Sequence, residues 1–418
     1  MRRPPDPLPI SVPLPPAAQP DNSAPLPGGR QGQAGPVLSL AWAHFLNDGA
    51  ANYLPGILPA MLVALGLPIA YAGGIMAVLI IGQGLQPLTG LLSDRLGGRA
   101  LPIAGLAGTS LGAAWLGWTH GLGGLVAALV LIGVANSFFH PPALAAVRRA
   151  SGGSGEHAIA VFSAGGEVGR GLWPLLASLV VAAWGLHDLW LLSLAAIPTL
   201  PWLWRQVPPL PRRHAGASAW RGLRAAWRPM SSLLAYSALR NVMLLAVTAF
   251  VPLLWQERGG SLVTGAALIT TMLMVGIIGN FGAAFLAQRW GRQRLVFWAT
   301  AMACALLAAY LFAAGIWIWL LLAALGIAIF STLPLTVIMG QDLLPQNHAL
   351  GSGLALGFAN ALGAVGVALL GLLAVRWGSV GVLWAGEACG LAALAWAHFL
   401  PRGPVRPGEP IAGACDPI

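Results

Sequence analysis

The sequence contains no lysine and few charged residues of any kind. Charged side chains make up 8% of the 418 residues, whereas hydrophobic residues make up 57% and the mean hydropathy is +0.76. A soluble domain carries roughly a quarter charged residues and needs them to cover its surface. The scarcity of charge therefore excludes an ordinary soluble globular protein and indicates a chain that is surrounded mostly by lipid.

Cysteine is equally scarce, which argues against disulfide and metal frameworks. The three cysteines, Cys304, Cys389 and Cys415, show no Cys-x-x-Cys spacing and have no histidine cluster beside them in the sequence. This pattern supports neither a disulfide framework nor a zinc site. We also find no P-loop and no nucleophile elbow in a plausible setting. The sequence therefore predicts a protein that is not an enzyme and uses neither a cofactor nor a metal.

The basic residues are all arginines, and the net charge is +10. Such a charge can indicate a nucleic-acid-binding protein. Here the arginines lie between apolar segments that could not belong to a soluble fold, so we expect no nucleic-acid partner.

Long apolar segments recur through the chain. Each is about 20 residues or longer and can cross the hydrocarbon core of a bilayer as a helix, the form that satisfies every backbone polar group there. The sequence thus predicts an all-α membrane protein with twelve transmembrane helices. The predicted spans are 37–62, 70–93, 100–119, 122–147, 157–184, 187–205, 230–256, 262–288, 294–313, 315–342, 349–375 and 379–400.

The distribution of arginine predicts the orientation. If the N-terminus is cytoplasmic, loops on the opposite side hold only Arg258 and Arg376. The cytoplasmic loops then hold Arg95, Arg99, Arg148, Arg149, Arg205, Arg212, Arg213, Arg221, Arg224, Arg228, Arg289, Arg292 and Arg294. By the positive-inside rule, both termini are expected in the cytoplasm and the protein in the inner membrane.

A proline- and arginine-rich segment divides the helices six and six. We expect a basic cytoplasmic linker at 207–229 between an N-terminal bundle at 36–206 and a C-terminal bundle at 230–401. Two pseudo-symmetric halves of this kind are typical of secondary transporters. Residues 1–35 and 402–418 lack the apolar core of a signal peptide and are predicted to be cytoplasmic tails, the first of them disordered.

A short motif occurs at the same place in both halves. The loop after the second span contains Asp94-Arg95-Leu96-Gly97-Gly98-Arg99, and the loop after the eighth contains Gln288-Arg289-Trp290-Gly291-Arg292. Together with Gly90, the first copy resembles the signature loop of the major facilitator superfamily. That resemblance implies alternating access by a monomer, with Gly90, Asp94, Arg95, Arg99 and Arg289 as gating residues.

Several further motifs, in order, resemble the fosmidomycin-resistance transporters of that superfamily. They are His44-Phe45-Leu46-Asn47-Asp48, Ser137-Phe138-Phe139-His140-Pro141, Gly165-Gly166, Pro174-Leu175-Leu176 and Gln341-Asp342-Leu343-Leu344-Pro345. The resemblance implies export of small drugs and toxic metabolites, including an anionic phosphonate, in exchange for protons. The chain departs from the pattern at Pro142, where an acid is common, and at Glu167 and Arg170, where small or polar residues are found.

Charged residues inside the spans are candidates for coupling because each costs at least ~2.5–3.5 kcal/mol to insert. His44 and Asp48 share a helix face and could bind and release a proton, or could form a structural pair. Glu167 and Arg170, three residues apart, form either an ion pair that lowers the cost of insertion or a pair for which substrate or proton competes. We assign Asp48, His44 and Glu167 to proton coupling.

The expected substrate-binding residues are Arg240, Arg170, His140 and Asn52. The guanidinium of Arg240 suits a carboxylate or phosphonate, unless it extends to the cytoplasmic interface. His140 precedes Pro141-Pro142, which should kink or break the helix and expose a substrate site, although a purely structural kink is the alternative.

Two further acids lie in or near the predicted spans. Asp342 stands at a helix end and is expected to be a gate or cap, and Glu387 has no evident partner in the sequence.

The combined pattern predicts a proton-driven exporter of a small drug-like or anionic compound. Two alternatives remain open: a proton-coupled importer of an organic anion, and a non-transporting membrane receptor on the same scaffold. The partners expected are a small-molecule substrate, protons and the lipid bilayer.

Overall fold

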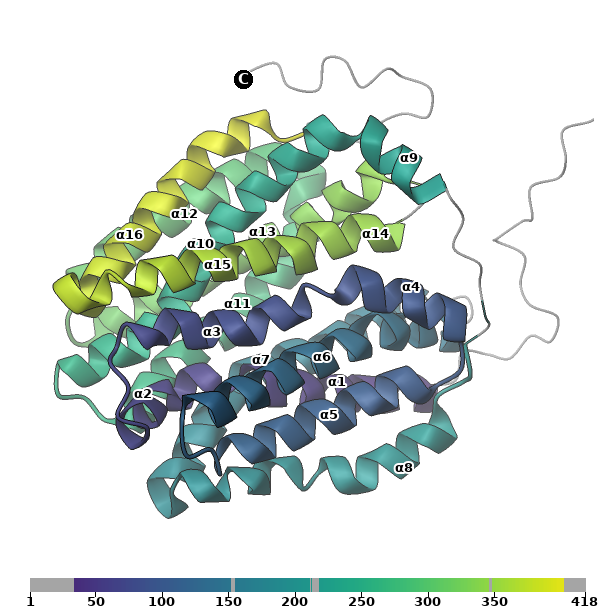
Figure 1. The fold of residues 1–418 in the computed structure, drawn as a ribbon. Helices are drawn as coiled ribbons and strands as arrows, with labels where there is room; N and C mark the ends of the chain where they lie inside the picture. Colours follow the sequence, from purple (N-terminus) through teal and green to yellow (C-terminus); the bar gives the residue numbers. More distant parts are fainter. Residues whose placement is uncertain (1–33, 152–154, 211, 213–217, 346–347, 402–418) are drawn as a thin grey trace, which may run out of the picture.

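The computed structural model describes residues 34–151, 155–210, 212, 218–345 and 348–401. This part of the chain is almost entirely helical, and its helices form two groups: α1 to α8 in one, and α10 to α16 in the other (Figure 1). Apart from Ala34 and Gly35, the predicted tails lie outside the described residues. The described part contains one isolated β-bridge, between Gly98 and Leu210, and no longer strand.

The first group covers the six spans predicted in the N-terminal half. Its elements are α1 (Ala34–Asn52), α2 (Leu54–Ala64), α3 (Tyr71–Gln83), α4 (Gln86–Leu96), α5 (Ala100–Leu116), α6 (Leu122–Ala150), α7 (Gly155–Trp184), η1 (Leu186–Ser193) and α8 (Ala196–Gln206). A short helix, α9 (Ser218–Ala225), follows in the predicted linker.

The second group covers the other six spans. Its elements are α10 (Trp227–Glu257), α11 (Leu262–Trp290), α12 (Arg292–Leu311), α13 (Ile316–Leu343), α14 (His348–Gly353), η2 (Leu354–Phe358), α15 (Ala359–Gly371), α16 (Ala374–Trp396) and η3 (Ala397–Phe399). Backbone φ of +62° at Gly378 interrupts α16 and separates the last two spans, where the sequence also predicts a boundary.

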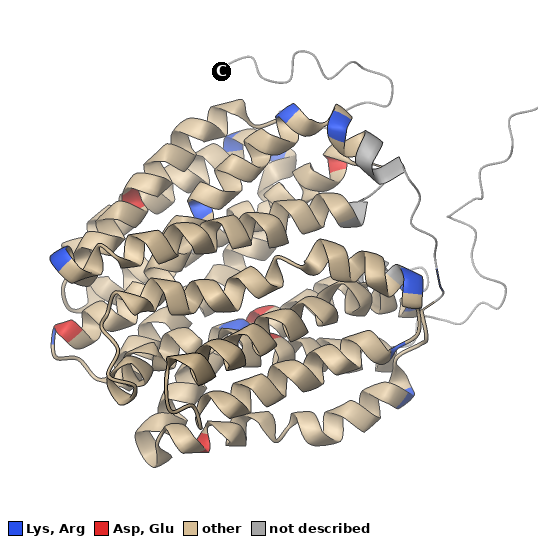
Figure 2. Cartoon of the chain, viewed as in Figure 1, with Lys and Arg blue, Asp and Glu red and all other residues tan. Residues whose placement is uncertain are grey.

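The prediction of an all-α membrane protein is confirmed. Eight described helices are long and apolar enough to cross a membrane. The other four predicted spans are also helical, but each is irregular. The first is interrupted at Tyr53, between α1 and α2, and α5 has 17 residues. Helix α7 carries two charges in its middle, and the span formed by η1 and α8 changes helix type. Charged residues lie mostly near the helix ends, and few lie within the helices (Figure 2).

Of the predicted kink or break after His140, the break is wrong, because α6 continues through Pro141 and Pro142. Proline has no N–H, so Pro141 cannot donate to the carbonyl of Ser137 four residues earlier. The hydroxyl of Thr89 in α4 donates to that carbonyl instead, at 2.6 Å. A neighbouring helix thus satisfies the group that the proline leaves free, which is how membrane helices tolerate proline.

Between the two groups, α3 packs on α15, α7 on α11 and α4 on α14, and among the described residues the hydrophobic core that both groups share lies at the α2 end. There α2 contacts α10 and α11, and one core cluster includes both Ile57 of α2 and Phe250 of α10. At the other end, near α9, a second core cluster contains residues of the second group alone, including Met230 and Met339. The structure is therefore closed between the halves at the α2 end.

Glycine allows the close contacts between the halves. A Cβ at Gly73 in α3 would clash with the carbonyl of Val367 in α15, and one at Gly171 in α7 would lie 2.6 Å from the sulfur of Met274 in α11. Small residues let membrane helices approach this closely.

We expect Thr89→Val to lower the free energy of unfolding by about 1–3 kcal/mol, because it leaves the buried Ser137 carbonyl without a donor. The measurement is unfolding of the purified protein in detergent. Thr109→Val is the matched control, because that hydroxyl donates to Gly105 of its own helix. Equal stability of the two variants would contradict the assigned role of Thr89.

Candidate functional site

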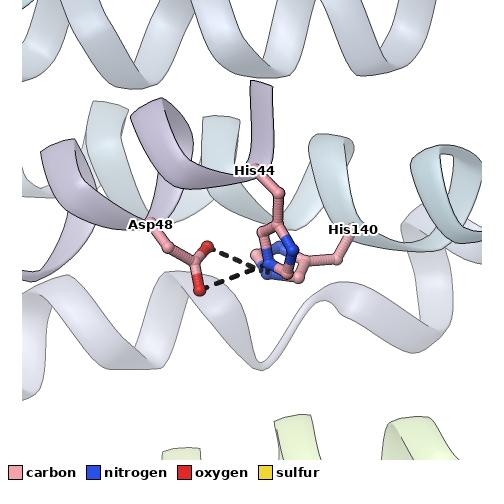
Figure 3. A group of neighbouring side chains, drawn as sticks. All are labelled: His44, Asp48 and His140. Atoms are coloured by element: carbon pink, nitrogen blue, oxygen red, sulfur yellow. Dashed lines mark hydrogen bonds and ion pairs between the residues drawn. The ribbon is translucent and has the colours of Figure 1, made fainter. Parts of the chain in front are cut away.

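A buried carboxylate lies where α1, α6 and α7 meet. The Asp48 side chain is 1% exposed and faces two imidazoles (Figure 3). Its Oδ2 lies 3.4 Å from Nε2 of His44, one turn earlier in α1, and its Oδ1 lies 3.1 Å from Nε2 of His140 in α6. Three of the residues proposed from the sequence are therefore in one place.

Arg170 of α7 supplies the positive charge next to this carboxylate. Its Nη2 lies 2.9 Å from Oδ2 of Asp48, and its Nη1 lies 3.4 Å from Oε1 of Glu167. Glu167 also accepts a hydrogen bond from Nδ2 of Asn280 in α11, at 3.2 Å. Because α11 belongs to the second group, Asn280 connects the charged cluster to the other half of the molecule.

Asn52, at the end of α1, contacts the same cluster through the backbone. Its Nδ2 donates to the carbonyl of Asp48 at 2.8 Å. Asn52 therefore lies next to Asp48, but its side-chain amide is used in a hydrogen bond to the last turn of α1.

The hydrogen bonds of the two imidazoles fix their chemistry. Nδ1 of His44 lies 2.8 Å from the carbonyl of Phe162, and Nδ1 of His140 lies 3.1 Å from the carbonyl of Asn136. A carbonyl can only accept, so both Nδ1 atoms must donate, which makes Nε2 of each neutral ring an acceptor. The two Nε2 atoms are 3.3 Å apart and both face Asp48.

Three acceptors therefore converge, and a positive species between them stabilises the group. A proton on either Nε2 converts that ring into a donor to Asp48. A metal ion could also take this place, since His44, Asp48 and His140 each offer a ligand atom within 4.8 Å of the others. The sequence alone predicts no metal site, because the cysteine spacing indicates none and the convergence of residues from different helices is not visible in the sequence.

The Gly165-Gly166 motif positions His44. A Cβ at Gly165 would clash with the carbonyl of Ala41, and one at Gly166 would clash with the His44 ring. Without these side chains, α7 approaches α1 closely enough for the ring to stack on Phe162, with centroids 4.1 Å apart. A sequence motif with no chemistry of its own thus holds the imidazole at Asp48.

Arg240 lies apart from this cluster, in α10 of the second group. Its side chain is 1% exposed, so it does not extend to the interface. No guanidinium nitrogen has a hydrogen-bond partner among the residues that the structure describes, and neither does Ser237 Oγ or Asn241 Oδ1. The amide nitrogen Nδ2 of Asn241 donates to Oδ1 of Asn360 in α15 at 2.6 Å.

The predicted gating residues lie near helix ends, in separate places. The guanidinium of Arg99 donates to the carbonyl of Trp204 and lies 5.6 Å from its ring centroid. Arg95 is exposed, and the Asp94 side chain is outside the described residues. Gly90 faces Pro141, and Arg289 lies over the ring of Phe285.

Asp342 forms an ion pair with Arg292, at the start of α12. The sequence indicates Asp342 but not Arg292 as its partner, although Arg292 stands in the second copy of the loop motif. Asn280 was also missed, and its position in an apolar helix gave no signal beyond its polarity.

Comparisons with known proteins agree with the helical architecture. The sequence model of the Major Facilitator Superfamily matches residues 40–366. The fosmidomycin resistance protein of Escherichia coli (strain K12) is 26% identical over 348 residues, which cover 80% of this chain and 85% of that protein. The uncharacterized MFS-type transporter YfnC of Bacillus subtilis (strain 168) is 23% identical over 353 residues, covering 81% and 86%.

Solved structures show the same fold. A mutant of the nucleoside transporter NupG superimposes with a TM-score of 0.70 at 14% identity, covering 86% of this chain and 98% of that one. A bacterial homologue of the human lysosomal transporter Spinster, in an inward-facing and occupied conformation, superimposes with a TM-score of 0.69 at 15% identity, covering 88% and 97%.

Arg240 and Arg170 should respond oppositely to loss of charge. Arg240→Met should raise the free energy of unfolding by about 3 kcal/mol, because it removes an unpaired buried charge. Arg170→Met should lower it by about 3 kcal/mol, because it leaves Asp48 and Glu167 without their cation. Denaturation in detergent measures both, with the exposed Arg289→Met as control. Destabilisation by Arg240→Met would show that a group outside the described contacts pairs with Arg240.

Proposed function

Because the chain belongs to the Major Facilitator Superfamily and is a secondary transporter rather than an enzyme, we propose that it exports small drug-like or anionic metabolites in exchange for protons. The observation that carries the proposal is the Asp48 cluster, in which three acceptors converge inside the membrane. Such a group accommodates one proton readily and is costly without a cation.

The coupling reaction uses Asp48, His44 and Glu167. A proton taken up between Asp48 and an imidazole competes with Arg170 for the carboxylate. Arg170 then interacts more strongly with Glu167, which weakens the hydrogen bond that Asn280 donates to Glu167. Since Asn280 belongs to the opposite half, proton binding changes the free energy of the contact between the halves, as alternating access requires.

The substrate site uses charges from both halves. Arg240 offers a guanidinium in the C-terminal half that no described residue pairs with, and Ser237 and Asn241 also have oxygens without a hydrogen-bond partner there. A carboxylate or phosphonate would satisfy that guanidinium with paired hydrogen bonds. Arg170, His140 and Asn52 contribute from the N-terminal half, so a substrate that touches both sides links their relative motion.

In the proposed topology, the protein lies in the inner membrane and both termini are in the cytoplasm. The α2 end, where the halves share their core, then faces outwards, and the structure is closed to the outside. Gly90, Asp94, Arg95, Arg99, Arg289 and Asp342 lie at the opposite, cytoplasmic ends and act as gating residues. We propose that 36–206 and 230–401 move as two bundles of one monomer around the linker 207–229.

A second candidate function is uptake of an organic anion together with protons. The unpaired Arg240 favours it, because a buried cation attracts an anion from either side. Accumulation of a labelled substrate in whole cells, compared with accumulation in inverted vesicles, distinguishes uptake from export.

We expect Asp48→Asn to abolish proton-coupled transport while the protein remains in the membrane, because the amide cannot hold the coupling proton as the carboxylate does. The measurement is susceptibility of an efflux-deficient host to a compound panel that includes fosmidomycin, with empty vector and uncoupler as controls. Full resistance from Asp48→Asn would rule out Asp48 as the coupling group. A receptor on the same scaffold would show neither resistance nor uncoupler sensitivity.

For Arg240, loss of the guanidinium should act on anionic compounds selectively. Arg240→Gln should lower transport of anions at least about tenfold, the equivalent of one charge-assisted hydrogen bond. Transport of neutral compounds in the same panel should change little and serves as the internal control. Equal transport of anions by Arg240→Gln and the parent would mean that Arg240 does not bind them.

A further inference from the structure

We propose that His44, Asp48 and His140 form a binding site for one divalent transition-metal ion of the Zn²⁺ type. The ion would occupy the place that the coupling proton takes in the proposed function. Binding of the ion depends only on the geometry of these three side chains and their neighbours. Its consequence, inhibition of transport, rests on the proposed function.

The separations of the three ligand atoms match a tetrahedral site. With metal–ligand bonds of about 2.0–2.1 Å, two ligands of a tetrahedral ion lie about 3.3–3.4 Å apart. The two Nε2 atoms are 3.3 Å apart, and they lie 3.4 Å and 3.1 Å from their nearest oxygens of Asp48. The 3.4 Å distance is to Oδ2 and the 3.1 Å distance is to Oδ1, and one ligand atom from each residue lies within 4.8 Å of the others. A movement of the Asp48 carboxylate, without rearrangement of the helices, would therefore bring one oxygen and the two Nε2 atoms onto one face of a tetrahedron.

The groups around these ligands have the arrangement that metal-binding histidines require. Such a histidine almost always donates its second N–H to a carbonyl or carboxylate, which fixes the ring and its tautomer. Both rings do so here, His44 to the Phe162 carbonyl and His140 to the Asn136 carbonyl. Two histidines and one carboxylate are also a protein ligand set found in zinc sites, with the fourth position left for water.

Arg170 competes with the metal ion for the carboxylate of Asp48. Its Nη2 lies 2.9 Å from Oδ2 of Asp48, which weakens the attraction of that oxygen for a second cation. Oδ1 has no contact with Arg170 in the described structure and faces His140. The side chains of His140 and Arg170 are 22% and 29% exposed, so the cluster can be reached from an accessible surface although Asp48 is buried.

Protons should compete with the metal, since each Nε2 must be free of hydrogen to bind it. The titratable and charged groups at the site are His44 and Asp48 from α1, His140 from α6, and Glu167 and Arg170 from α7. The facing residue from α11, Asn280, is neutral. Affinity for the metal should therefore fall as the pH is lowered.

The experiment is a titration of the metal-free, full-length protein in detergent with Co²⁺, followed by visible absorption. A tetrahedral Co²⁺ ion should appear at one per chain, and Zn²⁺ should displace it. His44→Gln and His140→Gln should each weaken binding at least about tenfold, since even changes around a ligand cost 10–100-fold. Arg170→Gln should strengthen it, the opposite direction to the ligand variants.

A pair of exposed histidines provides the matched control. His120 and His187 lie outside the cluster, with ring centroids 6.4 Å apart, and are the alternative place for an adventitious ion. Binding by the His120→Asn, His187→Asn double variant should equal that of the parent. Loss of binding in this control, or retained binding in both ligand variants, would overturn the proposal.

Two further measurements keep the result interpretable. If a ligand variant fails to fold, the parent protein still decides: Zn²⁺ should raise its unfolding temperature, and less so at lower pH. Absence of both this shift and the Co²⁺ spectrum would overturn the metal site. Proton-coupled transport measured in metal-free proteoliposomes tests the proposed function separately, so transport without metal binding contradicts this inference alone, and metal binding without transport contradicts the proposed function alone.

Discussion

The need to neutralise one carboxylate inside the membrane organises the N-terminal half. Asp48 is almost fully buried, and an isolated charge there would destabilise the protein strongly. Helices α1, α6 and α7 each contribute a polar group to it, and Gly165 and Gly166 bring α7 close enough for this to happen. Close packing and charge compensation therefore occur in a single contact between three helices.

The C-terminal half presents the opposite situation. Arg240 is as deeply buried as Asp48, but no described residue balances it. Natural proteins accept such a cost where it serves recognition or switching, because the missing interaction can be supplied by a ligand. The two buried charges thus differ in their surroundings: Asp48 has counter-charges beside it, and Arg240 has none among the described residues.

Several of the membrane helices depend on neighbouring helices, either for a hydrogen bond to a backbone carbonyl or for small residues that allow close packing. Thr89 of α4 completes the hydrogen bonding of α6 at its two prolines, and glycines at Gly73 and Gly171 allow contact between the halves. The Thr89 contact lies within the N-terminal half, whereas the glycine contacts lie between the halves. In a transporter that alternates between two conformations, the contacts between the halves must differ by only a few kcal/mol in free energy.

The sequence by itself determined the all-α membrane architecture and the pairing of His44 with Asp48, and it predicts twelve apolar spans divided six and six. All of these are local, since the length of an apolar run and the spacing of one helical turn can be read directly. Only the tertiary structure decided that His140 and Arg170 meet Asp48, that α6 continues through its prolines, and that Arg240 has no described partner. Those outcomes depend on how each helix is rotated against its neighbours, and rotation is set by packing between residues that are far apart in the chain.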